Sequence, residues 1–272
     1  MPNDRLSSLI TLRSRDNPRL KLLHALSRAS RDRRKHGLTL LDGPHLLQAA
    51  ADVGWPLLEL FVSDRGLHDP EILAVLARHP EVPLTLLTEG CFAHVSPVDT
   101  PSGVLALMQY PASPAGVGHP DAVRVLLEGV QDPGNLGTII RTAAAAGVDT
   151  VLLTHGSTQA WSPRALRAGM GGHFGLRIIE NVDPAQVFDG FQGKVLATEL
   201  SERAHPLYAL DLHGPSVWLF GAEGAGLSPV LAARANCHVT IPMSGAVESL
   251  NVGAAVAICL FEQYRQRNCA PR

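Results

Sequence analysis

The fold class follows from residues 123–147, which read VRVLLEGVQDPGNLGTIIRTAAAAG. Residues 123–130 form an apolar run without alternation, as expected of a parallel strand covered on both faces. A turn at Asp132-Pro-Gly follows, and then a helix-forming segment that ends at Gly147. The stretch therefore predicts a β-strand that leads directly into an α-helix, which is the repeating unit of an α/β fold.

The same alternation continues to the C-terminus and also precedes this stretch, with short connections throughout. It predicts a largely parallel sheet with helices on both faces. Residues 111–121, PASPAGVGHPD, have no hydrophobic period and contain three prolines and two glycines, so they predict a linker. The expected domains are residues 1–110, a small α/β domain, and residues 122–272, a larger one. The predicted strands span 38–43, 57–63, 82–88, 103–110, 123–130, 150–154, 176–180, 194–200, 216–223 and 238–243, and the predicted helices 44–54, 71–78, 135–147, 162–172, 183–191, 228–235 and 249–267.

Charge is distributed unevenly along the chain. The formal net charge is only −2, but residues 1–36 hold ten Lys and Arg against three acids. A basic arm on an otherwise acidic protein suggests a polyanionic partner such as nucleic acid. The alternative is a solvated helix face, because Leu20, Leu22, Leu23 and Leu26 form an apolar stripe behind these charges.

The remaining composition describes an ordinary globular protein of 272 residues. The N-terminus lacks the apolar core of a secretory signal, and no apolar stretch is long enough to span a membrane. The four cysteines show no C-x-x-C spacing, so we expect reduced thiols in a cytoplasmic protein and no metal site.

Three segments contain residues that a purely structural role does not explain. Each of them follows a predicted strand, where open α/β sheets bind ligands. The first, residues 128–141, places Asn135 as a candidate helix N-cap and Arg141 among small and apolar residues. An arginine is seldom buried without a partner. Arg141 could pair with an acid such as Glu223, or it could face a phosphate.

The second segment, residues 220–229, reads FGAEGAGLSP. Its three closely spaced glycines allow the backbone to lie against a ligand, and Glu223 stands among them. The spacing fits neither a dinucleotide fingerprint nor a P-loop. The third segment, residues 241–252, runs from a strand into the last helix, with Ser249 and Asn251 at the entrance. Ser249 could cap that helix, and the free N–H groups there could also receive ligand oxygens.

Together the three segments resemble the signature of the SpoU (TrmH-type) RNA 2′-O-ribose methyltransferases of the SPOUT superfamily. The motifs are N-L-G-x-I-x-R-T-A at 135–143, G-A-E-G-x-G-L-S at 221–228 and I-P-M-x-G-x-x-x-S-L-N-V at 241–252. Residues 13–50 more weakly resemble the L30e-like substrate-binding domain of the ribosomal-RNA members. The family usually has Glu-Gly where this chain has Asp42-Gly43.

This resemblance implies a C-terminal SPOUT domain with a deep trefoil knot, a small N-terminal L30e-like α/β domain, and a homodimer with its active site at the interface. It also implies S-adenosylmethionine as cofactor, RNA as substrate, and rRNA rather than tRNA. Guanosine is the base expected, from the likeness of residues 241–267 to guanosine-modifying members, with adenosine as an alternative. The implied cofactor-binding positions are Gly221, Ile241 and Leu250, with Thr198, Ala222 and Met243 nearby.

The resemblance further implies a catalytic group of Arg141, Asn135, Glu223, Ser249 and Asn251. The family's proposals give Arg141 the role of base, but a guanidinium does not readily lose its proton. We therefore expect the planar guanidinium of Arg141 to bind an RNA phosphate through two N–H donors. The proton of the 2′-hydroxyl would leave to water or to a phosphate oxygen.

Two other functions remain to be distinguished. One is a catalytically silent RNA-binding or ribosome-assembly factor on the same fold, against which the intact catalytic group argues. The other is a Rossmann-type oxidoreductase, which should carry G-x-G-x-x-G after its first strand, whereas residues 129–137 read GVQDPGNLG.

Overall fold

The computed structural model describes residues 9–201 and 203–269, and the chain forms two compact units. The first unit comprises the chain up to Ala112 together with Trp161–Phe174. The second comprises Ser113–Ala160 together with the chain from Gly175 onward. The first eight residues of the basic arm, including Arg5, lie outside the described residues.

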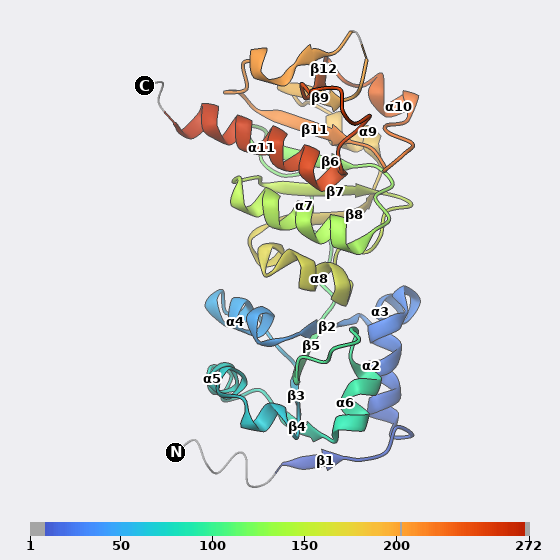
Figure 1. Ribbon diagram of the computed structural model, residues 1–272, viewed down its shortest axis with the longest axis vertical. Helices are drawn as coiled ribbons and strands as arrows, with labels where there is room; N and C mark the ends of the chain where they lie inside the picture. The colour runs from blue at the N-terminus through green and yellow to red at the C-terminus, as the bar shows by residue number, and fades with distance from the viewer. Residues whose placement is uncertain (1–8, 202, 270–272) are drawn as a thin grey trace. The chain divides into compact units, whose positions relative to one another are not determined.

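The first unit is built on a five-stranded sheet of order β1-β4-β3-β5-β2 (Figure 1). Four strands run in the same direction, and β5 runs antiparallel to both of its neighbours, so this sheet is mixed. The sequence pattern did not predict β1, α3, α6 or the direction of β5. The elements are β1 (Ile10–Leu12), α2 (Pro18–Arg28), α3 (Ser30–His36), β2 (Leu38–Asp42), α4 (Pro44–Asp52), β3 (Glu59–Ser63), η1 (Gly66–His68), α5 (Pro70–Ala77), β4 (Leu84–Leu87), α6 (Glu89–Val95), β5 (Val104–Gln109) and α8 (Pro163–Gly169), and η2 (Gly172–Gly175) follows α8.

Helices α2 and α6 pack side by side against this sheet. The apolar stripe of α2 is buried at Leu20, Leu23 and Leu26, where it meets Phe61 of β3 and Phe92 of α6 in one hydrophobic cluster. The basic residues of α2 remain on the outer side of the helix. The expected apolar stripe therefore exists, and it holds the basic face of α2 toward solvent.

Asp42, at the end of β2, is the position at which the resemblance leads one to expect a glutamate. Its carboxylate is fully buried and accepts a hydrogen bond from Ser102 Oγ at 2.6 Å and an ion pair from Arg167 of α8. Desolvation raises the pKa of this carboxyl, and the bonds from Ser102 and Arg167 oppose that rise. The shorter aspartate thus anchors α8 within the first unit.

The second unit contains a seven-stranded sheet of order β10-β12-β9-β11-β6-β7-β8, in which every pairing is parallel. This confirms the predicted parallel α/β architecture. The elements are β6 (Val123–Leu127), α7 (Pro133–Ala145), β7 (Thr150–Thr154), β8 (Arg177–Val182), α9 (Pro184–Phe188), β9 (Lys194–Thr198), β10 (His205–Pro206), η3 (Leu207–Ala209), β11 (Ser216–Phe220), α10 (Pro229–Ala232), β12 (Cys237–Thr240) and α11 (Val252–Asn268).

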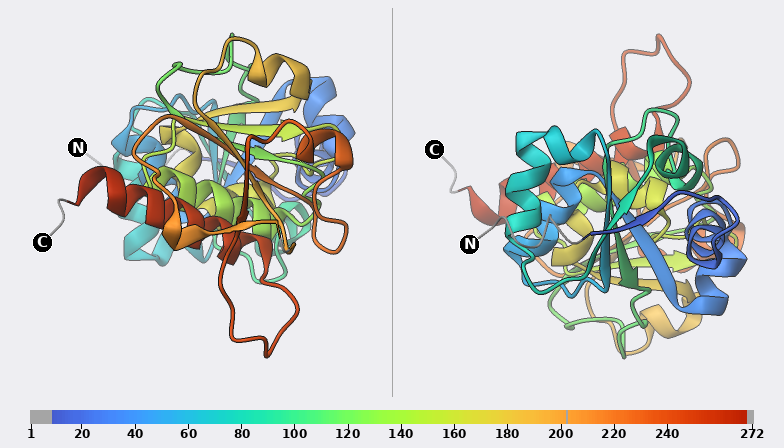
Figure 2. Two further views of the ribbon diagram at one scale, coloured as in Figure 1. Left: turned by 90° about the horizontal axis from the view of Figure 1, so that it is seen from above. Right: turned by 90° about the horizontal axis from the view of Figure 1, so that it is seen from below.

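Helices cover both faces of this sheet (Figure 2). On one face, Leu126 and Leu219 pack in a cluster with Val187 of α9 and Leu231 of α10. Helices α7 and α11 pack together on the opposite face. There the buried amide of Gln263 accepts hydrogen bonds from Trp218 Nε1 at 2.7 Å and from Ser216 Oγ at 2.8 Å, which ties α11 to β11.

The expected linker is held by two arginines of the second unit. Arg124 donates to the carbonyls of Gly118 and His119, and Arg177 donates to those of Ala115 and Gly116. Among the described residues, no helix combines the length and the apolarity that a membrane crossing requires. Cys91, Cys237, Cys259 and Cys269 are free thiols.

Candidate functional site

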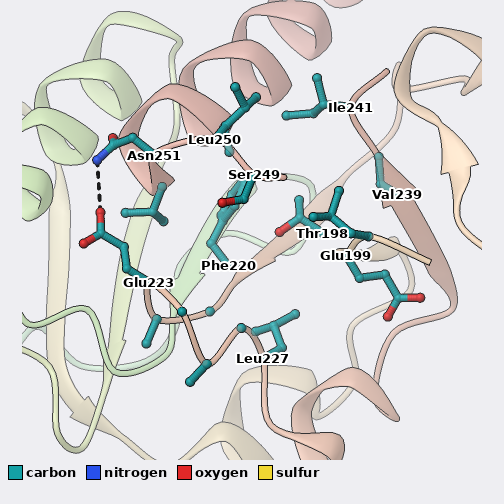
Figure 3. A pocket seen from close by; sticks show the side chains of 18 of the residues that line it. Thr198, Glu199, Phe220, Glu223, Leu227, Val239, Ile241, Ser249, Leu250 and Asn251 are labelled. Atoms are coloured by element: carbon teal, nitrogen blue, oxygen red, sulfur yellow. Dashed lines mark hydrogen bonds between the residues drawn. The ribbon is translucent and has the colours of Figure 1, made fainter. Parts of the chain in front are cut away.

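The three motif segments meet beside a cavity at the carboxyl ends of the strands of the second unit. The cavity has a volume of about 650 Å³, within the range of small-molecule sites. Figure 3 shows Ser249, Leu250 and Ile241 on one side and Leu227 on the other, with Phe220 between them. The lining residues are Thr198–Leu200, Phe220–Leu227, Ala232, Val239, Ile241, Met243, Ser249–Val252 and Ala255.

The glycine-rich loop after β11 turns back on itself because it has no side chain at Gly221. A Cβ there would lie 2.0 Å from the carbonyl carbon of Gly226, which no structure tolerates. Gly224 and Gly226 have φ of 82° and 67°, a conformation that favours glycine. Glu128, at the end of β6, holds the far side of the loop by accepting a hydrogen bond from Ser228 N at 2.7 Å. The backbone of the loop therefore forms a wall of the cavity.

Three polar side chains join the motif segments at the edge of the cavity. Asn135 Nδ2 donates to Glu223 Oε1 at 2.5 Å, and Asn251 Nδ2 donates to the same oxygen at 3.0 Å. Asn251 Nδ2 also lies 3.1 Å from Asn135 Oδ1, which accepts from it. Figure 3 shows Glu223 and Asn251 pointing toward one another. We call Asn135, Glu223 and Asn251 the polar triangle.

The helix caps differ from those expected. Asn251, not Ser249, caps α11, because its Oδ1 accepts from Gly253 N at 2.9 Å and from Ala254 N at 3.3 Å. The helix accordingly begins at Val252, three residues later than predicted. Asp132 caps α7 by accepting from Asn135 N at 2.7 Å, which leaves the Asn135 side chain in the first turn and free to join the polar triangle.

Arg141 stands apart from the polar triangle in a single chain. Its side chain is exposed on α7 and does not line the cavity. The expected alternative of an ion pair with Glu223 is wrong, since Glu223 accepts from Asn135 and Asn251 instead. The apolar residues around Arg141 suggest that it is buried, but it is exposed. Ile139 and Ile140 point to the core, whereas Thr138 and Arg141 share the outer face of the helix.

The six expected cofactor-binding residues all line the cavity. They are Thr198, Gly221, Ala222, Ile241, Met243 and Leu250. Ser249 also lines it, with its side chain toward the centre in Figure 3.

Sequence reasoning did not single out Glu199, which lines the cavity beside Thr198. Its position directly after β9 was a usable signal, because ligands bind at the carboxyl ends of parallel strands. Arg203 Nε donates to Glu199 Oε1 at 2.9 Å, Ser201 donates to the same oxygen, and His238 Nδ1 lies 3.2 Å from Oε2. The Arg203 hydrogen bond is the main reason why the pKa of Glu199 falls to about 2. The Glu199 carboxylate is therefore ionised at neutral pH, where Arg203 pairs with it.

Comparison with known proteins places this site in a family. Residues 122–261 match the SpoU rRNA Methylase family, and residues 17–106 match the MRM3-like substrate binding domain. The chain is 31% identical to the 23S rRNA (guanosine(2553)-2'-O)-methyltransferase RlmP of Bacillus subtilis, over 85% of this chain and 90% of that protein. It is 29% identical to the mitochondrial rRNA methyltransferase 3 of Xenopus laevis, over 91% of this chain and 74% of that protein.

Solved structures agree with these matches. The AdoMet-bound rRNA methyltransferase of Sinorhizobium meliloti superposes with a TM-score of 0.82 at 29% identity, covering 96% of this chain and 99% of that one. The SpoU methyltransferase AviRb of Streptomyces viridochromogenes, in complex with AdoMet, superposes with a TM-score of 0.81 at 25% identity, covering 92% of this chain and 99% of that one. The chain belongs to the SpoU rRNA methylase family. It is an S-adenosylmethionine-dependent RNA 2′-O-methyltransferase.

The cavity fits that cofactor chemically. Apolar walls at Phe220, Leu227 and Ile241 suit a flat purine, and the backbone of the glycine-rich loop that lines the cavity offers polar groups to its edge. Within residues 9–201 and 203–269, no cluster of His, Cys, Asp and Glu is arranged to hold a metal ion.

Proposed function

We propose that this enzyme methylates the 2′-hydroxyl of a guanosine in 23S rRNA. The observation that carries the proposal is the polar triangle, which brings three distant motif segments together at the edge of the cavity. The guanosine and 23S assignments rest on the Bacillus relative, whose name specifies both, and on a match over most of both chains. The MRM3-like match over residues 17–106 supports a substrate-binding role for the first domain.

The triangle would orient the substrate hydroxyl. S-adenosylmethionine, when bound, supplies a methyl group that is already activated on a sulfonium. The protein must then align the 2′-oxygen and help to remove its proton. Both amides of the triangle donate to Glu223 Oε1, and Oε2 has no partner among the described residues. We assign Oε2 as the acceptor that orients the ribose hydroxyl, with Ser249 as a second contact.

Arg141 would complete the site from a second copy of the chain. It is exposed on α7, which packs on α11, and α11 carries the exposed aromatic pair Phe261 and Tyr264, 47% and 39% exposed. Exposed aromatic side chains of this kind are typical of protein interfaces. In such a dimer Arg141 would hold an RNA phosphate with two parallel N–H donors and stabilise the developing negative charge.

The experiment uses purified enzyme, labelled S-adenosylmethionine and deproteinised 23S rRNA, 16S rRNA and tRNA. The labelled RNA is digested to nucleosides and the products are separated. The proposal predicts label in 2′-O-methylguanosine from 23S rRNA. Label in another ribose-methylated nucleoside, or in tRNA alone, would overturn the substrate assignment and leave the enzyme class intact.

A further inference from the structure

A group of four basic side chains converges on the outer side of α2 and α6 in the first unit. The rings of His24, on α2, and His94, on α6, stack in parallel with their centroids 4.1 Å apart. Arg15, just before α2, donates to the carbonyl of Gly90 at the start of α6. Arg28, at the end of α2, donates to the carbonyl of Ser96 just after α6. We call these four residues the α2–α6 basic cluster.

The hydrogen bonds of the cluster fix the side chains without neutralising them. Both guanidiniums are held by backbone carbonyls, which carry no formal charge, so each keeps a full positive charge and further N–H donors. His24 Nδ1 lies 2.7 Å from the carbonyl oxygen of His94. Because a carbonyl can only accept, Nδ1 carries a proton, and Nε2 can donate to an external anion when the ring is protonated.

Carboxylates do not balance this charge among the described residues. None of the ten ion pairs there includes Arg15, His24, Arg28 or His94. Asp16, next to Arg15, pairs with Lys21, and the Glu89 carboxylate accepts from Arg65 N at 2.7 Å.

The pKa of His94 is lowered in part by the same neighbouring charges. Desolvation lowers it first, and then the positive charges of His24, Arg15 and Arg28 lower it further. Two guanidiniums that are held by neutral acceptors beside two stacked imidazoles form a surface that an external anion would stabilise.

We propose that the α2–α6 basic cluster is a binding site for backbone phosphates of the RNA substrate. This inference rests on the proposed function for the identity of the polyanion. The guanidiniums stand at opposite ends of the seven-residue helix α6, a rise of roughly 10 Å at 1.5 Å per residue. That span exceeds one phosphate group, so the cluster contacts at least two successive phosphates, with the imidazoles between them.

The test compares the double variant Arg15→Gln/Arg28→Gln with the matched control Arg31→Gln/Arg34→Gln. The control removes the same charge from exposed positions of the neighbouring helix α3. RNA affinity is measured with deproteinised 23S rRNA fragments and a single-stranded oligonucleotide over a series of salt concentrations. Thermal unfolding and cofactor titration check that each variant is folded.

The cluster variant should bind RNA about tenfold more weakly at low salt, and its log–log salt slope should shrink by about 1.4, from about 0.7 for each of two phosphates. The control should change affinity less than threefold. Equal losses of RNA affinity in both variants would mean that the basic arm acts through net charge alone. That result would refute the proposed phosphate-binding site. RNA binding is read without methyl transfer, so a wild-type enzyme that methylates no rRNA would refute the proposed function while this comparison still decides the site.

Discussion

Gln263 is predicted to be the main polar anchor between the last helix and the central strand of the second unit. Its side-chain oxygen accepts from Trp218 Nε1 and Ser216 Oγ, and its Nε2 donates to the carbonyls of Leu212 and Gly214. Substitution Gln263→Met keeps nearly the same volume and removes all four hydrogen bonds. Trp218 and Ser216 are 0% and 2% exposed, so water cannot replace the lost acceptor.

Each buried donor that is left without an acceptor costs about 1–3 kcal/mol. The two donors together should therefore lower the free energy of unfolding by about 2–6 kcal/mol. Guanidinium unfolding measures the loss, and hydrogen exchange of β11 peptides locates it. Gln186→Met, at an exposed position of α9, is the control and should stay within about 0.5 kcal/mol of the wild type. A loss of less than about 1 kcal/mol in Gln263→Met would show that packing alone holds α11 to the sheet.

Three further predictions concern the site. Substitution Arg141→Lys should lower kcat about 100-fold with little change in cofactor affinity, because an ammonium cannot reproduce a planar fork; near-normal turnover in a single-turnover assay would refute that role. Substitution Asn135→Ala should likewise lower kcat more than cofactor affinity, and equal losses in both would make the polar triangle a cofactor contact. Glu199 has a folded pKa of about 2, below its ordinary value of 4.5, so the stability it contributes is present above pH 4.5 and lost as the pH falls toward 2. The difference in unfolding free energy between wild type and Glu199→Gln should therefore vanish over that range, and a difference independent of pH would contradict the assignment.

Much of the fold was predictable because the second unit is parallel throughout. Strands buried on both faces leave apolar runs such as residues 217–220, and proline at the first turn marks helices such as α8, which Ser162 caps as expected. The first unit was harder to predict. Strand β1 is only three residues long, and α6 has seven, too short for a clear helical period.

The site was predictable as a set of segments but not as a set of contacts. Sequence could not show that Asn251 rather than Ser249 caps α11, because both residue types cap helices well. Nor could it show that Arg141 faces outward, since alanines on an exposed helix face look like core. The trefoil knot and the homodimer stay predictions.

The most direct test of the account is calorimetric titration of S-adenosylmethionine into the wild type and the variant Gly221→Ala. A Cβ at Gly221 would lie 2.0 Å from the Gly226 backbone, so the loop that walls the cavity must shift. Gly214→Ala is the control, because a Cβ there meets nothing within 4 Å. Cofactor affinity should fall at least tenfold in Gly221→Ala and stay unchanged in Gly214→Ala. Wild-type affinity in Gly221→Ala, with its fold intact, would contradict the claim that this cavity holds the cofactor.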